Sequence, residues 1–252
     1  MINPGVSVSS HINELKKRLL WLIAAVIVTT MISFYFHEEI IEFLLLPAEG
    51  LTEIPGRLVF IEVTEMLGVI MKVSFMSGFV LVFPLFLYQA IRFASPGLTR
   101  REKVFLAFLI PGVLVTFFVG SAFSYFIVIP SALNFLINFG SDIAQPNIRI
   151  SNYVNTVLML LFWMGIVFQT PVVMVVLSKM GVVRPSRYAG FRRFWVVIAF
   201  VMAAVITPTL DPINQCLVAA PLIVLFEVGY WISKLLTRKK SEKLSKTEVG
   251  LS

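Results

Sequence analysis

Six apolar runs, separated by short polar segments, constrain this chain more than any other feature of its sequence. They cover residues 19–36, 66–91, 104–129, 153–178, 194–207 and 213–233. A helix needs about 20 apolar residues to cross the hydrocarbon core of a bilayer. The residues are 58% hydrophobic and 14% charged, whereas a soluble domain is about 45–50% apolar and about 25% charged. The pattern predicts an all-α integral membrane protein with six transmembrane helices.

The last two runs differ from the first four because they are short. The stretch 194–206 would span only about 20 Å as a helix, and Asn214, Gln215 and Glu227 interrupt the sixth run. Between them, residues 207–212 carry two prolines and an aspartate, which predicts a tight turn and a helical hairpin. We therefore expect one transmembrane domain over residues 1–233, with short fifth and sixth helices, and a disordered basic tail over 234–252.

The distribution of basic residues predicts the orientation of the chain. With both termini in the cytoplasm, eighteen of the 21 lysines and arginines fall in inside segments. Only Arg57 and Arg149 fall outside, and Lys72 lies in or near the second span. Because basic residues concentrate in cytoplasmic loops, this indicates an N-in, C-in topology. The first outside loop is acidic and contains the amphipathic stretch HEEIIEFLL, which predicts an interfacial helix.

Sequence motifs for catalysis are missing from the chain. It has no P-loop, no dinucleotide fingerprint and no HExxH. His11 and His37 fall on opposite sides of the membrane in the predicted topology, and Cys216 is the single cysteine. The net charge of +7 is spread between apolar runs, which disfavours a nucleic-acid partner. We expect a non-enzyme without a cofactor or a metal site.

Two polar segments at the predicted cytoplasmic rim are candidate binding elements. In SHINELKKRLL, His11, Glu14 and Arg18 share one helix face, and Glu14 and Arg18 form an i, i+4 pair that by itself adds only a few tenths of a kcal/mol. In FASPGLTRREK, Glu102 is the one acid among three basic residues, on the first turn of the third helix. The helix dipole alone could explain a carboxylate there.

Polar residues inside the runs are a second set of candidates, because ionisable groups in a membrane are costly. Glu227 and Lys72 could snorkel or pair near an interface, and Gln169 could make an interhelical hydrogen bond. Four prolines should kink the spans and favour a curved, concave bundle; they are Pro84, Pro111, Pro171 and Pro221.

Four segments resemble motifs of the TatC family of the twin-arginine translocase. SHINELKKRLL is similar to its HLxELRxRL opening, and FASPGLTRREK is similar to its FxxPxLxxxE loop. FQTPVVMVVL resembles its F-E-x-P-V segment, and ITPTLDPINQ resembles its TPxxD…Q turn. The resemblance implies a glove-shaped six-helix receptor in the cytoplasmic (inner) membrane of a prokaryote. Such a receptor binds twin-arginine signal peptides of folded precursors, and export uses the proton-motive force.

The resemblance also implies roles for residues. Glu102 matches the glutamate that reads the signal-peptide arginines, Phe93 is its loop neighbour and Glu14 shares the task. The same surface would include Lys16, Arg18, Pro96 and Leu98. Small single-span TatA/TatB-type subunits would dock at polar groups near the membrane, and these are Gln169, Thr207, Asp211, Gln215 and Glu227. Membrane lipid and self-association complete the expected partners.

The chain departs from the family pattern at two positions. Lys16 stands where the family has arginine, which keeps the charge but loses the planar fork. Gln169 stands where the family has glutamate, which puts a proton-linked role there in doubt. The alternatives are a small secondary transporter, which would show inverted repeats, and a membrane scaffold, in which the rim acids would be dispensable.

Overall fold

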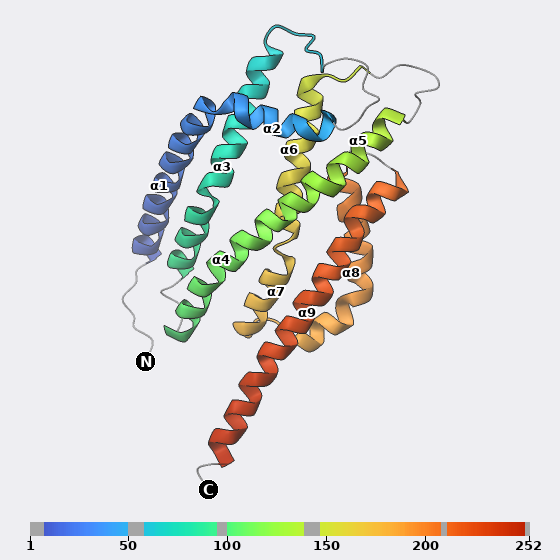
Figure 1. The fold of residues 1–252 in the computed structure, drawn as a ribbon. Helices are drawn as coiled ribbons and strands as arrows, with labels where there is room; N and C mark the ends of the chain where they lie inside the picture. Colours follow the sequence, from blue (N-terminus) through green and yellow to red (C-terminus); the bar gives the residue numbers. More distant parts are fainter. Residues whose placement is uncertain (1–7, 50–57, 95–99, 139–146, 208–210, 250–252) are drawn as a thin grey trace. The chain divides into compact units, whose positions relative to one another are not determined.

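The structure is a computed structural model of the 252-residue chain. It describes residues 8–49, 58–94, 100–138, 147–207 and 211–249. Figure 1 shows that the described part of the chain is almost entirely helical. In chain order the elements are α1 (Val8–Tyr35), α2 (His37–Glu49), α3 (Glu65–Ala94), α4 (Arg100–Phe123), the π-helical turn η2 (Ser124–Val128), α5 (Ile129–Asn138), α6 (Ile150–Val167), α7 (Thr170–Lys179), α8 (Pro185–Ile206) and α9 (Pro212–Val249). An isolated bridge between Val59 and Arg149 is the one β pairing within the described residues.

Six helical segments among the described residues are long and apolar enough to cross a membrane. This confirms the predicted all-α membrane protein with six transmembrane helices. The fifth segment ends at Ile206, as the sequence predicts, but α8 begins at Pro185 rather than at the start of the apolar run. Its first turns contain arginines, which can be helical outside the hydrocarbon. The apolar run therefore predicts how much of the helix lies in lipid, and it does not predict where the helix begins.

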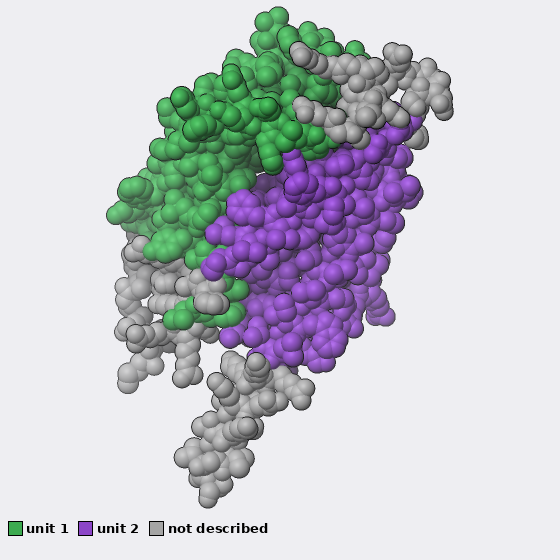
Figure 2. Space-filling model, viewed as in Figure 1, with its two compact units in different colours: residues 1–50, 55–110, 147–158 green, residues 51–54, 111–146, 159–252 purple. Residues whose placement is uncertain are grey.

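The chain divides into two compact units, coloured separately in Figure 2. Unit 1 comprises residues 1–50, 55–110 and 147–158, and unit 2 comprises residues 51–54, 111–146 and 159–252. Helices α4 and α6 each contribute one part to each unit. The single transmembrane domain expected over residues 1–233 stays a prediction.

Unit 1 is built on the packing of α1 against α3. The two helices approach closely at Gly78, where a Cβ atom would lie 2.7 Å from the backbone nitrogen of Thr30. Thr29 donates a hydrogen bond from Oγ1 to the Gly78 carbonyl at 2.9 Å. The predicted amphipathic helix is present as α2, and the Tyr153 hydroxyl donates to its Leu44 carbonyl at 2.7 Å. Small residues thus set the helix spacing, as is usual between membrane helices.

Unit 2 has α9 packed against both α7 and α8. At Gly229 of α9, a Cβ atom would lie 2.9 Å from the Cα atom of Pro171 on α7. Trp195 of α8 stacks on Phe226 of α9 with ring centroids 4.8 Å apart, and its indole N–H donates to the Leu222 carbonyl. These contacts fix the α8–α9 hairpin that the turn predicted.

Prolines explain two irregularities of the helices. Pro171 has no N–H to donate to the Val167 carbonyl, so α6 ends at Val167. The Thr170 hydroxyl donates to that carbonyl instead, at 2.7 Å. Pro130 follows η2, where the Ile129 N–H donates to the Ser124 carbonyl five residues back. Pro84, Pro111 and Pro221 lie inside continuous helices.

The last helix, α9, extends beyond the sixth apolar run. The helix continues through the basic segment to Val249, and the disordered basic tail expected over residues 234–252 stays a prediction. Lysine and glutamate have high helix propensity, and the segment directly extends a helix already nucleated by the preceding span.

Candidate functional site

An arginine-centred cluster joins the start of α1 to the end of α3 within unit 1. Arg18 donates from Nε to Oε1 of Glu14 at 3.1 Å, and its Nη2 pairs with the same oxygen. Its Nη1 donates to Oε1 of Gln89 on α3 at 3.0 Å. The Arg18 side chain is 14% exposed and that of Glu14 is 40% exposed. A half-buried arginine therefore orients a more exposed carboxylate.

This cluster confirms the predicted i, i+4 pair and adds a partner that the sequence did not reveal. Gln89 lies 71 residues from Arg18 in the chain, so no local spacing connects them. Because Arg18 also bonds α3, its position is fixed more firmly than in an isolated surface pair, which contributes about 0–1 kcal/mol. Lys16 is exposed on the same helix.

The second predicted rim segment lies only partly within the described residues. Phe93 is in the last turn of α3 and Glu102 is in the first turn of α4, but their side chains lie outside the described part, as do Pro96 and Leu98 altogether. Six residue steps separate Ala94 from Arg100, so these helix ends are at most about 22 Å apart. Because α4 begins at Arg100, Glu102 lies in its first turn, as the sequence predicts.

A polar cluster in unit 2 surrounds Gln169, just before α7. Its Oε1 accepts a hydrogen bond from Thr116 Oγ1 of α4 at 3.0 Å. Its Nε2 donates to the Val113 carbonyl at 3.0 Å and to the Gly165 carbonyl at 3.3 Å. The Gln169 backbone N–H bonds to Ile166 instead, so the side chain supplies the donor that Gly165 lacks. The amide both repairs the break between α6 and α7 and holds α4.

The turn before α9 forms a buried polar cluster. Asp211 caps α9, accepting at Oδ1 from the Asn214 backbone N–H at 2.7 Å, and its Oδ2 accepts from the Asn214 side chain. Ser131 of α5 donates to Asn214 Oδ1 at 2.8 Å. Thr207 bonds back to the Ala203 carbonyl at 2.8 Å. Asp211, Thr207 and Asn214 are all buried, which indicates a structural network rather than an open docking surface.

Two further predicted docking residues have partners on α8. Gln215 donates to the Phe200 carbonyl at 3.1 Å. Glu227 accepts from Arg192 Nη2 at 2.7 Å, and the Arg192 guanidinium also lies over the Tyr230 ring, 4.4 Å from its centroid. Glu227 is thus an ion-pair partner in the α8–α9 hairpin, which was one of the two interpretations left open by the sequence.

Comparison with known proteins supports the motif resemblance. The family model described as Sec-independent protein translocase protein (TatC) matches residues 10–221. A Sec-independent protein translocase protein TatC of Aquifex aeolicus is 38% identical over 237 residues, covering 93% of this chain and 97% of the relative. The TatC of Carboxydothermus hydrogenoformans is 32% identical, covering 95% of this chain and 98% of the relative. A chloroplastic TATC of Arabidopsis thaliana is 36% identical, covering 92% and 68%.

Solved structures agree with these relatives. The crystal structure titled Twin Arginine Translocase Receptor- TatC superposes with a TM-score of 0.77 at 38% identity, covering 90% of this chain and 99% of that one. The structure of the receptor in DDM superposes with the same TM-score at 37% identity, covering 88% and 99%.

Proposed function

Because this chain belongs to the TatC family of Sec-independent protein translocase proteins, a membrane transport family and not an enzyme family, we propose that it is the receptor that binds twin-arginine signal peptides. The binding surface is the end of unit 1 where α1 begins, α3 ends and α4 begins. Folded precursors are the cargo, and the proton-motive force drives their export. The membrane is the cytoplasmic membrane of a prokaryote, with both termini in the cytoplasm.

The placement of Glu14 is the observation that supports this proposal most directly. Its carboxylate is held by Arg18, which is itself bonded to α3, and it remains 40% exposed. A guanidinium group is best bound by carboxylates that accept two parallel hydrogen bonds. Glu102, on the first turn of α4, supplies the second carboxylate.

The two acids have unequal roles in this proposal. Glu14 already bonds Arg18, so an incoming arginine must compete for its carboxylate. Glu102 stands among basic neighbours, where it is the local acid for an incoming cation. Hydrogen bonds to charged groups contribute about 1.5–3 kcal/mol, against about 0–1 for an exposed pair. We therefore assign most of the arginine contact to Glu102.

The test is binding of a twin-arginine precursor to the purified protein in detergent. Glu102→Gln should weaken binding about tenfold or more, because a charged acceptor is lost. Glu14→Gln should weaken it less. The matched control is Glu39→Gln, an exposed acid of α2, which should bind like the parent. Equal binding by Glu102→Gln and the parent would refute the assignment, and a twin-lysine precursor supplies the ligand control.

Partner docking is the second part of the proposal. Small single-span TatA/TatB-type proteins would meet unit 2 near Gln169 and Thr116. The Gln169 oxygen has two lone pairs, and Thr116 occupies one of them. A polar side chain of the partner helix would donate to the other. Thr207, Asp211, Gln215 and Glu227 would support this region by holding α9, α5 and α8 together.

A further inference from the structure

A cavity of about 210 Å³, lined by both charged and apolar residues, lies between α3, α6 and the segment before α3, all within unit 1. Its volume is many times what one water molecule requires. The residues that line it are Glu62, Glu65, Gly68, Val69, Lys72, Arg149, Ser151 and Val154. Two of them are cationic and two are anionic, and the rim residues of the proposed signal-peptide surface are not among them.

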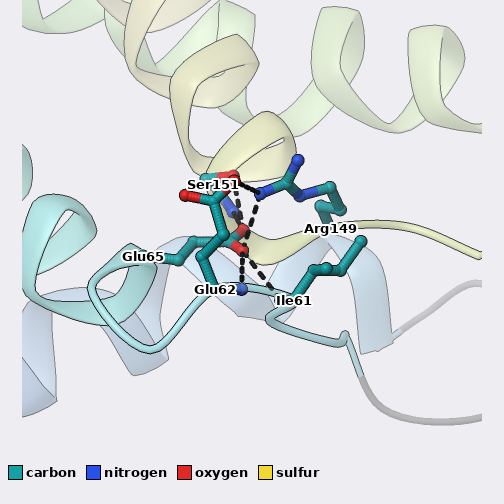
Figure 3. A network of polar contacts seen from close by, with 5 residues as sticks. All are labelled: Ile61, Glu62, Glu65, Arg149 and Ser151. Atoms are coloured by element: carbon teal, nitrogen blue, oxygen red, sulfur yellow. Dashed lines mark hydrogen bonds and ion pairs between the residues drawn. The ribbon is translucent and has the colours of Figure 1, made fainter.

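One carboxylate of the cavity is fully engaged by the protein (Figure 3). The Glu65 side chain is 3% exposed. It accepts from Arg149 Nη2 at 2.9 Å, from the Ser151 hydroxyl at 2.5 Å and from the Ile61 N–H at 2.9 Å. The hydrogen bond to Glu65 raises the pKa of Arg149 above its usual value. Glu65 and Arg149 therefore form the fixed wall of the cavity.

Lys72 is the cation of the cavity that the protein leaves uncompensated. Its Nζ donates to the neutral Oδ1 of Asn155 at 2.9 Å, and none of the ion pairs among the described residues includes it. Seven residues, or about 10 Å along the helix, separate it from Glu65 at the start of the span. A lysine at this depth extends its ammonium group towards the interface.

The surroundings of Lys72 indicate lipid rather than bulk water. Leu67, Met71 and Phe75 of α3 are each more than half exposed, and their i, i+4, i+8 spacing forms an apolar stripe on the helix face next to the one that carries Lys72. Phospholipid acyl chains would cover those side chains. The phosphate of the same molecule would then lie within reach of the ammonium.

Glu62, the fourth charged residue of the cavity, would attract a positive group of a ligand, whereas Lys72 would attract a negative group. The Glu62 side chain is 69% exposed, and its contact with Arg149 is a long 3.4 Å. Arg149 is closer to Glu65, so it compensates Glu62 only in part. The cavity is thus lined by an exposed carboxylate and by an ammonium without an ion pair, which together complement a ligand with a negative and a positive group.

We propose that this cavity binds the headgroup of an aminophospholipid such as phosphatidylethanolamine, with its phosphate on Lys72 and its amine on Glu62. The acyl chains lie along the exposed apolar face of α3. In the predicted topology this site faces the outer leaflet.

The test is lipid binding to the full-length, delipidated protein in detergent, counted by native mass spectrometry during titration with phosphatidylethanolamine. The parent should bind a first phosphatidylethanolamine molecule more tightly than any further one. Lys72→Gln should weaken that binding about tenfold, because a charge-assisted bond to phosphate is lost. Lys17→Gln, at an exposed lysine of α1, is the matched control and should bind like the parent. Equal binding by Lys72→Gln and the parent would overturn the site.

Two further arms test the chemistry of the ligand. Glu62→Gln should abolish the preference for phosphatidylethanolamine over phosphatidylglycerol, and a preserved preference would overturn the amine assignment. The soluble headgroup, glycerophosphoethanolamine, should fail to displace the lipid at equal concentration. Displacement by it would show that acyl chains add nothing and would overturn the phospholipid assignment. Apparent unfolding temperatures equal to that of the parent should accompany each variant, and a fall for Lys72→Gln without lipid would mark a structural residue instead.

Discussion

At the scale of single residues, Gln169 has a role that depends on its being an amide. Its two N–H groups donate to the Val113 and Gly165 carbonyls, and its oxygen accepts from Thr116. A protonated carboxylic acid has one donor, so it could keep the bond from Thr116 and a bond to one carbonyl. An ionised carboxylate could keep only the first. Glutamine therefore satisfies this site without titrating.

Substitution of Gln169 tests this reasoning. Gln169→Glu should retain export at neutral pH, because the protonated acid preserves most of the bonds. Gln169→Leu should reduce partner association modestly, since interhelical hydrogen bonds in membranes average about 0.6 kcal/mol and reach about 1.7. The measurement is crosslinking of a partner helix to α7 alongside export of one cargo. If Gln169→Leu crosslinks and exports like the parent, the residue serves packing alone.

At the scale of elements, the start of α9 depends on one side chain. Asp211 caps the helix and also bonds the side chain of the buried Asn214. Pro212 follows at the first helical position, where its missing N–H costs nothing. The turn that resembles the family motif therefore has a sufficient structural explanation in this chain.

Replacing the cap should destabilise unit 2. Asp211→Ala removes the cap, which should lower the free energy of unfolding by about 1 kcal/mol. It also leaves a buried amide donor without its acceptor, which should lower that free energy by about 1–3 kcal/mol. Asp211→Asn keeps an acceptor for the Asn214 backbone N–H and should cost less. Both are compared with the parent by apparent unfolding temperature in detergent at one scan rate. An unchanged temperature for Asp211→Ala would contradict the capping role.

At the scale of the whole molecule, the distribution of basic residues predicts orientation across the membrane. Single cysteines at Arg193 and Glu39, in a Cys216→Ala background, should label from the cytoplasmic and the outer side respectively. Both positions are exposed in the structure, whereas Asp211 is buried and would be a poor reporter. Labelling of position 193 by an impermeant reagent in intact cells would reverse the predicted topology.

The sequence by itself determined the number of spans, the amphipathic helix α2 and the pairing of Glu14 with Arg18. Each of these depends on neighbours within about one helical turn or one apolar run. Transfer into lipid is a property of a continuous segment, and i, i+4 contacts follow from helix geometry alone. The four family motifs could also be identified from the sequence, because each is a continuous segment.

Only the tertiary structure decided which distant groups meet. Gln89 binds Arg18 across 71 residues, Thr116 binds Gln169 across 53, and Glu65 binds Arg149 across 84. The first pairing accompanies close packing of α1 and α3 at Gly78, and the second accompanies close packing of α4 and α6 at Gly120 and Gly165. No local spacing encodes any of the three. The start of α8 at Pro185 was missed for a related reason, since hydropathy marks where a helix enters lipid and not where its hydrogen bonding begins.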